Sequence, residues 1–242
     1  MTPFSLMHTH PSWHDAISNA FHAMDPQYVE ILLSASHWLP GPEKIFNAFS
    51  LPLDQVNYVL LGESPYPRVL SANGYAFWDA AVTNLWSDTG LSKAVNRATS
   101  LRNIIKMLLL AKKSLKPSAM SQEDVARVDK TGLVQTNADF FQNFMDHGFL
   151  LLNASLVLRE VEGKVRQDVT AWQPFLKSIF MFLVKSNPSV AFLLLGNLAQ
   201  NIKPLLPPKT RCFVAEHPYN ISFIQNKKVL DFFRPLDLLK GV

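Results

Sequence analysis

Three short apolar runs in the sequence end next to residues that can do chemistry. Ser64 comes two residues after the run YVLLG, Asn153 is the last residue of FLLLN, and His217 directly follows CFVAE. A carboxamide can donate and accept hydrogen bonds at once, a hydroxyl can hold a water molecule, and an imidazole can donate to a group that gains negative charge. These residue types suit a site that binds a polar ligand and stabilises charge as a bond breaks.

These runs and a fourth, over residues 190–196, are typical of strands that are buried on both faces of a parallel sheet. Helical apolar spacing occurs over residues 13–35, where Asp25-Pro26 separates two expected helices. Further helices are expected around residues 100–113, 172–185, 197–205 and 226–233.

Strands that alternate with helices predict an α/β fold, with a central four-stranded parallel sheet in a three-layer α/β/α arrangement. Ligands of such sheets bind beyond the carboxyl ends of the strands. The candidate residues lie at these ends.

The composition is that of one folded domain. The chain has 242 residues, 48% of them hydrophobic, and neither a repeat nor a linker divides it. We therefore expect a single domain over residues 1–242, with a flexible N-terminal arm at residues 1–11. The net charge of +4 and the pI near 9.1 are mildly basic, which suits a polyanionic partner without requiring one.

Cysteine content and hydropathy argue against several classes of protein. The single cysteine, Cys212, cannot form an internal disulfide, and its apolar neighbours predict a core position. No Cys/His cluster has the spacing of zinc ligands, so we expect no metal and no cofactor. The apolar stretches at 107–111, 180–184 and 190–195 are far shorter than the roughly 20 residues of a membrane span. We expect a soluble, cytoplasmic monomer.

A series of short motifs follows one order between about residues 12 and 240. The segments are SWHD (12–15), FNAF (46–49), LLGESPYPR (60–68), GYAF (74–77), TSLRNI (99–104), GFLLLN (148–153), LLLGNLAQ (193–200) and EHPYNIS (216–222). In this order they resemble the motifs of the uracil-DNA glycosylase superfamily, most closely those of family 1. The resemblance implies the fold of that family and uracil-containing DNA as the partner.

The resemblance also implies that a flipped uracil base is held by side chains of these motifs. Phe77 would stack on the base, Asn153 would pair with its N3 and O4, and Tyr66 would exclude the methyl group of thymine by volume. Glu63, from the same motif as Tyr66, is a fourth candidate for substrate binding. Core packing for Phe77, capping for Asn153 and a structural role for Tyr66 are the alternatives.

Two catalytic candidates come from the same comparison of motifs. His217 would donate a hydrogen bond to O2 of the base as it leaves with negative charge. Ser64 stands where the family has an aspartate that positions a water and stabilises the cationic sugar. A purely structural histidine is the alternative for His217.

Several residues are candidates for contact with DNA. Ile221 stands in the place of the family's leucine wedge, and Phe223 could share this task. Phosphate contacts are assigned to Ser100, Ser222 and the amides around Gly196 and Asn197, with a solvated turn as the alternative. The basic stretch AKKSLK (111–116) is either a solvated helix end or a segment that tracks a phosphate backbone.

The segment GESPYP departs from the family pattern at its central position. A serine hydroxyl can hold a water but carries no charge, and the loss of such a charge typically costs several powers of ten in rate. Glu63 is adjacent, but neighbouring residues of an extended loop point to different sides. Other branches of the superfamily also lack the aspartate and are active. In the last motif, Tyr219 and Asn220 replace a serine and a proline.

The leading hypothesis is a DNA glycosylase that hydrolyses the N-glycosidic bond of deoxyuridine in base excision repair, with activity weakened or altered by Ser64. One alternative is a non-catalytic DNA- or base-binding protein on the same fold. The other is a glycosylase for a different damaged base.

Overall fold

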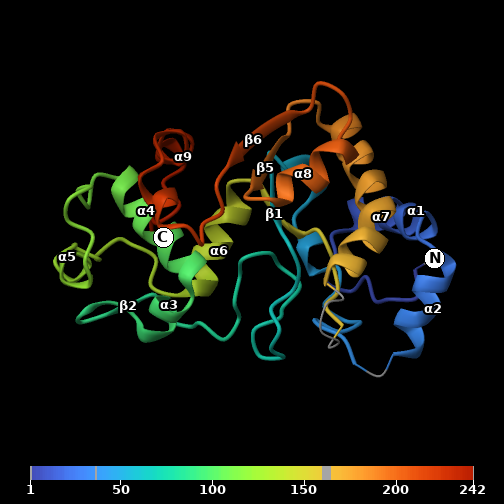
Figure 1. Ribbon diagram of the computed structural model, residues 1–242, viewed down its shortest axis with the longest axis horizontal. Coiled ribbons are helices and arrows are strands. Elements are labelled where there is room, and N and C mark those ends of the chain that lie inside the picture. Colours follow the sequence, from blue (N-terminus) through green and yellow to red (C-terminus); the bar gives the residue numbers. More distant parts are fainter. Residues whose placement is uncertain (1, 36, 160–164, 242) are drawn as a thin grey trace. The chain divides into compact units, whose positions relative to one another are not determined.

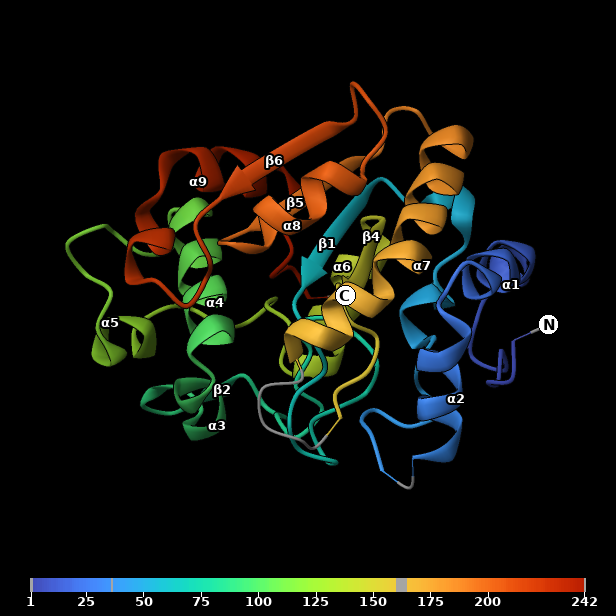
Figure 2. The same cartoon turned by 45° about the vertical axis from the view of Figure 1, so that its right-hand side comes forward.

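The computed structural model describes residues 2–35, 37–159 and 165–241. Its main sheet has the strand order β4-β1-β5-β6. Figure 1 labels β1, β5 and β6 of this sheet, and Figure 2 labels all four strands. The strands are β1 (Tyr58–Gly62), β4 (Phe149–Asn153), β5 (Ala191–Leu195) and β6 (Arg211–Ala215). β1 pairs in parallel with both β4 and β5. The predicted α/β fold, with a four-stranded parallel sheet flanked by helices, is confirmed.

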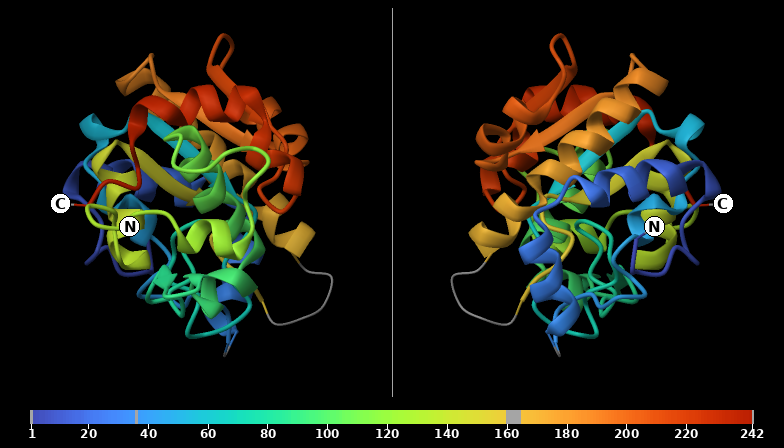
Figure 3. Two further views of the ribbon diagram at one scale, coloured as in Figure 1. Left: turned by 90° about the vertical axis from the view of Figure 1, so that its left-hand side faces the viewer. Right: turned by 90° about the vertical axis from the view of Figure 1, so that its right-hand side faces the viewer.

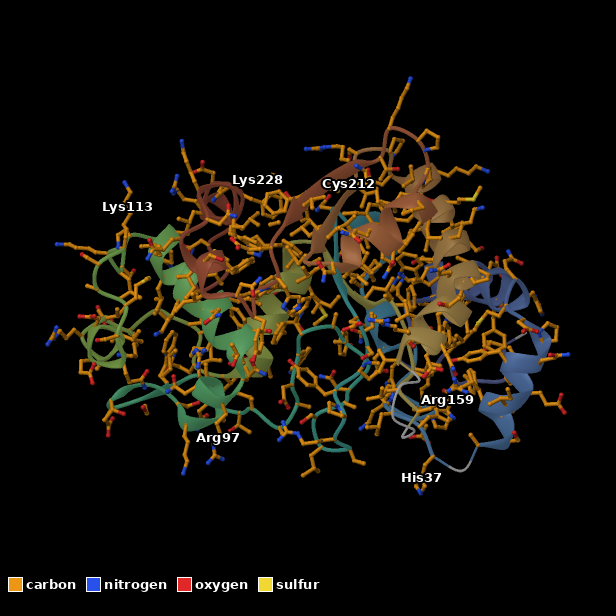
Figure 4. The ribbon with its side chains drawn as sticks, viewed as in Figure 1. His37, Arg97, Lys113, Arg159, Cys212 and Lys228 are labelled. Carbon is orange, nitrogen blue, oxygen red and sulfur yellow. The ribbon has the colours of Figure 1, made fainter. Side chains whose placement is uncertain are left out.

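Burial along the strands follows their place in the sheet. Every residue of β4 and β5 is buried, whereas the edge strand β6 has no fully buried residue. Cys212, labelled in Figure 4, lies on β6 and is only half-buried. Cys212 packs against the core of unit 1 but is not fully buried, so the expected core position is confirmed only in part, because an edge strand leaves one side without a neighbouring strand.

The helices agree with the predicted stretches, with α3, α5 and α6 in addition. They are α1 (His14–His22), α2 (Pro26–Ser34), α3 (Lys93–Arg97), α4 (Thr99–Ala111), α5 (Gln122–Ala126), α6 (Asn137–Asp146), α7 (Val165–Ser186), α8 (Leu198–Ile202) and α9 (Lys227–Phe233). A short hairpin, β2 (Trp86–Ser87) and β3 (Gly90–Leu91), was also not predicted. No helix within the described residues is long and apolar enough to cross a membrane.

The chain divides into two compact units. Unit 1 comprises residues 1–79, 148–194 and 198–213, and unit 2 comprises residues 80–147, 195–197 and 214–242. Unit 1 has 10 Lys and Arg against 10 Asp and Glu, whereas unit 2 has 13 against 9. The whole net charge of +4 therefore belongs to unit 2. The single domain expected from the sequence stays a prediction.

The core of unit 1 is rich in aromatic side chains. Helix α1 packs against α7, as Figure 3 also shows, and the rings of Phe46 and Phe175 stack 6.0 Å apart between their centroids. Phe4 is 7% exposed and makes an edge contact with Phe21 at 5.5 Å. Phe4 is thus packed within the segment expected to be a flexible arm, whereas its neighbours Pro3 and Ser5 are exposed, and the flexible arm stays a prediction.

In unit 2, α4 packs against α9 and against the turn at residues 221–225. Phe144 of α6 contacts Phe233 of α9 with centroids 6.4 Å apart. The unit thus has its own apolar core, on which the segment after β6 rests.

A buried ion pair forms between Arg159 and Asp168 of α7 in unit 1, and a hydrogen bond from Tyr28 connects it to α2. Asp168 is fully buried, and its Oδ1 accepts hydrogen bonds from Nε of Arg159 at 2.6 Å and from the hydroxyl of Tyr28 at 2.8 Å. The Arg159 guanidinium lies 5.2 Å from the centroid of the Tyr28 ring; its side chain is labelled in Figure 4. Burial, and then the hydrogen bond to Asp168, raise the pKa of Tyr28 above its ordinary value. The buried carboxylate of Asp168 therefore depends on Arg159 and Tyr28 for its hydrogen bonds.

Arg159→Met should lower the free energy of unfolding by about 3–5 kcal/mol, because it leaves the Asp168 charge buried without its counter-ion. Urea unfolding followed by circular dichroism measures the change. Arg127→Met is the matched control, since Arg127 pairs with Asp124 while its side chain is 78% exposed. The control should change stability by less than about 1 kcal/mol. Equal effects of the two substitutions would contradict the role given to the buried pair.

Candidate functional site

The candidate residues divide between the two units. Those of unit 1 follow β1 and β4 and come from the motifs assigned to base binding: Glu63, Ser64, Tyr66, Phe77 and Asn153. Those of unit 2 come from the motifs assigned to the leaving base and to DNA: Ser100, Gly196, Asn197, His217, Ile221 and Ser222.

Asn153 and Gly62 are register partners at the ends of β4 and β1. A Cβ atom on Gly62 would lie 2.5 Å from Oδ1 of Asn153, so any side chain at position 62 would displace the carboxamide. Asn153 is 3% exposed, and no residue in the described ranges hydrogen-bonds its carboxamide. The carboxamide nitrogen and oxygen of Asn153 keep some contact with solvent, so both are open to a ligand with a complementary edge.

The pairing of β1 with β4 continues beyond the strands. The Ala154 amide donates to the Gly62 carbonyl at 2.8 Å, and the Ser155 amide donates to the Glu63 carbonyl at 2.9 Å. The start of the GESPYP segment is therefore fixed by its backbone. Glu63 is exposed and Ser64 is half-buried, so the two neighbouring side chains have different surroundings.

Phe77 has an unusual backbone conformation, with φ of 63°. This left-handed region is rare for bulky residues and costs about 1–3 kcal/mol, so surrounding contacts must hold it. The amide of Ala76 donates to the Leu151 carbonyl at 3.0 Å, and the Tyr66 hydroxyl donates to the Phe77 carbonyl at 3.1 Å. Phe77 is half-buried and is not part of the core, the alternative considered for it from the sequence.

Tyr66 and Arg68 connect the loop after β1 to residues 77–79 through their side chains. Arg68 pairs with Asp79 at 2.9 Å, and Asp79 is 3% exposed. Burial, and then the Asp79 charge, raise the pKa of Tyr66 to about 12, although Arg68 opposes the shift. The phenol is therefore a neutral donor at any physiological pH. Sequence reasoning missed the Arg68–Asp79 pair, since no motif contains both residues.

In unit 2, the ring of His217 is oriented by its own loop. The Tyr219 amide donates to Nδ1 of His217 at 3.0 Å, so the neutral ring carries its proton on Nε2. Gly196 has φ of +68°, and a Cβ there would lie 2.8 Å from Cβ of His217. The Gly196 amide donates to the Ala215 carbonyl at 2.8 Å. In this structure Gly196 gives His217 room, while its amide is already engaged.

Asn103 holds the same loop from α4. It is 2% exposed, and its Nδ2 donates to the Pro218 carbonyl at 2.7 Å. The carbonyls of Tyr219 and Asn220 lie 3.4 and 3.5 Å from the same nitrogen. One buried amide thus faces three successive carbonyls after His217. Sequence reasoning placed Asn103 within the motif TSLRNI but assigned it no role.

The end of the loop is tied to the start of α9. The carboxylate of Glu216 accepts hydrogen bonds from the Ser222 hydroxyl and, at 3.0 Å, from Nδ2 of Asn226. Ile221 is 79% exposed, as a wedge would need to be. Phe223 is 1% exposed, so our suggestion that it shares the wedge role was wrong, because its ring is part of the core of unit 2.

The other candidates of unit 2 lie on helix ends and turns. Ser100 is half-buried in the first turn of α4, and Asn197 is exposed after β5. The basic stretch begins where α4 ends, and Lys112 forms an ion pair with Asp237. A cavity of about 330 Å³ is lined by Ala111, Lys112, Lys113, Arg234 and Asp237. Lys113 extends away from the ribbon in Figure 4.

Asn103→Asp should loosen the loop after His217, because a carboxylate would face three carbonyl oxygens in place of a donor. Hydrogen exchange measured by mass spectrometry on peptides spanning residues 217–223 should become about 5- to 150-fold faster, from a loss of about 1–3 kcal/mol. Asn143→Asp is the matched control, since Nδ2 of Asn143 donates to the carbonyls of Leu238 and Lys240. Unchanged exchange in Asn103→Asp, or an equal effect of the control on this loop, would contradict the assignment.

Comparison with known proteins places the chain in a family. No family model matches it. Wild-type UNG from Nitratifractor salsuginis is 36% identical in its crystal structure, with a TM-score of 0.91 over 97% of this chain and 94% of that one. Uracil-DNA glycosylase of Lachnoclostridium phytofermentans is 28% identical over 218 residues, which are 87% of this chain and 82% of the relative. Mimivirus uracil-DNA glycosylase shares the fold, with a TM-score of 0.58 at 18% identity over 88% of this chain and 70% of that one. The protein is an enzyme of the glycosylase class and belongs to the uracil-DNA glycosylase family.

Proposed function

We propose that the protein hydrolyses the N-glycosidic bond of deoxyuridine in DNA, releasing uracil and leaving an abasic site, at a rate lowered by Ser64. The observation that carries this proposal is the Asn153 carboxamide. It is buried at a strand end and has no hydrogen-bond partner in the part of the chain that the structure describes. Uracil presents a donor, N3–H, beside an acceptor, O4, which is the complement of a carboxamide.

Two aromatic residues support base recognition in unit 1. Phe77 is half-buried and held in a strained backbone conformation, which is common at ligand-binding positions. Tyr66 is held by its hydroxyl on the Phe77 carbonyl, so its ring has little freedom to move aside for a methyl group. The proposal gives Phe77 the stacking role and Tyr66 the exclusion of thymine.

Bond cleavage moves an electron pair from the C1′–N1 bond onto the base. Negative charge then develops on O2 of the base while positive charge develops on the sugar, and a fixed donor aimed at O2 stabilises the leaving base. The proposal assigns this donor to Nε2–H of His217, since the Tyr219 amide occupies Nδ1. Water then adds to C1′, its proton is lost to solvent, and the base is protonated.

Ser64 limits the other half of the reaction. A carboxylate near the sugar would stabilise the positive charge on C1′ and O4′, whereas the Ser64 hydroxyl can only hold the attacking water. Glu63 is exposed, so its charge is screened by solvent. The expected result is an enzyme that binds its base normally and cleaves slowly.

Contact with DNA is proposed for exposed and half-buried residues of unit 2. Ile221 would fill the gap left by the flipped base, and Ser100, Asn197 and Ser222 would approach phosphates. The excess of positive charge in unit 2 supports binding to a polyanion.

Asn153→Ala should lower kcat/KM for a uracil-containing oligonucleotide by about 100- to 1,000-fold, because the donor and acceptor for the base edge are both lost. Alkali cleavage of the abasic product, resolved on a denaturing gel, measures the rate. Asn201→Ala, at an exposed position of α8, should have no effect. Release of another damaged base from a substrate panel by the parent protein, with no release of uracil, would contradict deoxyuridine as the substrate.

Ser64→Asp should raise the single-turnover rate on the same oligonucleotide on the order of 100-fold, since it adds the missing negative charge beside the sugar. Ser64→Asn is the control, because it has nearly the same volume without the charge. A rate for Ser64→Asp no higher than for Ser64→Asn would show that charge at this position does not limit the reaction.

A further inference from the structure

Two side chains of the loop after β1 contact the same short segment, residues 77–79. The Tyr66 hydroxyl donates to the Phe77 carbonyl at 3.1 Å, and Nη2 of Arg68 donates to Oδ2 of Asp79 at 2.9 Å. Each contact joins residues that are 11 apart in the sequence, so the two segments run alongside each other in the same direction. The ion pair is therefore the next tie along the chain after the one that holds Tyr66.

The two members of the ion pair differ in their exposure. The side chain of Asp79 is 4% exposed, whereas that of Arg68 is 66% exposed. A buried carboxylate is strongly destabilised when its counter-ion is removed. The exposed loop that carries Arg68 is thus held against residues 77–79 by the charge of a buried partner.

The carbonyl that holds Tyr66 belongs to a residue with a strained backbone, Phe77, whose φ is 63°. Such a conformation persists only where surrounding contacts fix it. On one side of Phe77 the Ala76 amide donates to the Leu151 carbonyl at 3.0 Å, and two residues beyond it Asp79 is paired. Held on both sides, Phe77 keeps its carbonyl where the Tyr66 hydroxyl reaches it.

Arg68 itself lies on a turn with a fixed backbone. The amides of Ser71 and Ala72 both donate to the Arg68 carbonyl, at 3.0 and 2.9 Å, and both of these residues are buried. A side chain on a fixed backbone loses less conformational freedom when it makes its contact. The turn therefore favours the reach of the guanidinium to Asp79.

We propose that Arg68 and Asp79 are positioning residues that set the selectivity for uracil over thymine. This inference rests on the proposed action on deoxyuridine and on the exclusion of thymine by Tyr66. With the ion pair intact, the Phe77 carbonyl stays in place and the Tyr66 ring cannot move aside for a methyl group. Without it, Phe77 relaxes, the hydroxyl loses its acceptor and the ring is free to shift. Uracil has no methyl group and needs no such shift.

The test compares two single-stranded oligonucleotides that carry either one uracil or one thymine and are otherwise identical and free of both bases. Alkali cleavage of the abasic product gives kcat/KM for each. Arg68→Met should raise kcat/KM for the thymine strand and lower the selectivity ratio by about 10- to 200-fold, the range that one methyl group is worth in a pocket. Release of uracil should change by less than about fivefold. A variant that was only destabilised would lose both activities, so the gain on thymine identifies a positioning role.

Three further variants separate the ion pair from other effects of Arg68→Met. Asp79→Asn removes the charge without leaving a buried ion, so it carries the test if Arg68→Met does not fold, and it should lower the ratio equally. The double variant should be no worse than either single one, because the two residues act as a pair. Arg68→Lys keeps the cation and should keep the ratio of the parent protein. Arg127→Met, which removes a 78% exposed cation paired with Asp124, is the matched control and should leave the ratio unchanged.

Tyr66→Phe tests the route through the hydroxyl. It keeps the ring but removes the donor to the Phe77 carbonyl, so it should lower the ratio as Arg68→Met does. Adding Arg68→Met to Tyr66→Phe should lower the ratio no further.

Three results would overturn the proposal while leaving the proposed excision of uracil intact. They are an unchanged ratio in Arg68→Met and Asp79→Asn, a parallel loss of uracil and thymine release in both variants, and a full additional loss of selectivity when Arg68→Met is added to Tyr66→Phe. Failure of the parent protein to release uracil would instead contradict the proposed function, and this inference would fall with it.

Discussion

The carboxamide of Asn153 occupies space that any side chain at position 62 would fill. Gly62 and Asn153 are partners in the register of two parallel strands, so the pairing that builds the sheet also brings them together. The ladder continues through Ala154 and Ser155, which fixes the backbone at the start of the GESPYP segment. The base-binding half of the candidate site therefore depends on the absence of one side chain at the end of β1.

In unit 2, too, a glycine makes room for a candidate site residue, but the buried asparagine of this unit has hydrogen-bond partners. Gly196 leaves room for His217, and the buried Asn103 donates to the carbonyls that follow it. Both Asn103 and Asn153 are buried amides, but Asn103 has partners within the loop, whereas none of the described residues hydrogen-bonds the carboxamide of Asn153. The fold alone explains the burial of Asn103, whereas the open hydrogen-bonding groups of Asn153 support the proposed binding of a base.

Features encoded locally could be predicted from the sequence. The four strands and the separation of α1 from α2 at Asp25-Pro26 followed from apolar runs and a capping signal, and Asn153 and His217 were found because strand ends are where ligands bind. Three features could not be predicted: the Arg68–Asp79 pair, the contacts of Asn103 and the φ of Phe77. The two sets of contacts join segments that meet only in the tertiary fold, and the backbone angle of Phe77 depends on the contacts around it. The burial of Phe223 could not be predicted either. Its loop position suggested exposure, whereas packing within unit 2 buries its ring.

The position of Ser64 explains how family membership and rate can vary independently. No described residue hydrogen-bonds the Ser64 side chain, so neither the strand ends nor the strained segment at Phe77 requires a particular residue there. The residues proposed to hold the base are constrained by backbone geometry, and a relative with 36% identity superimposes with a TM-score of 0.91. The charge beside the sugar is constrained by chemistry alone. A substitution at this position can therefore change the height of the barrier by several kcal/mol while leaving the shape of the protein the same.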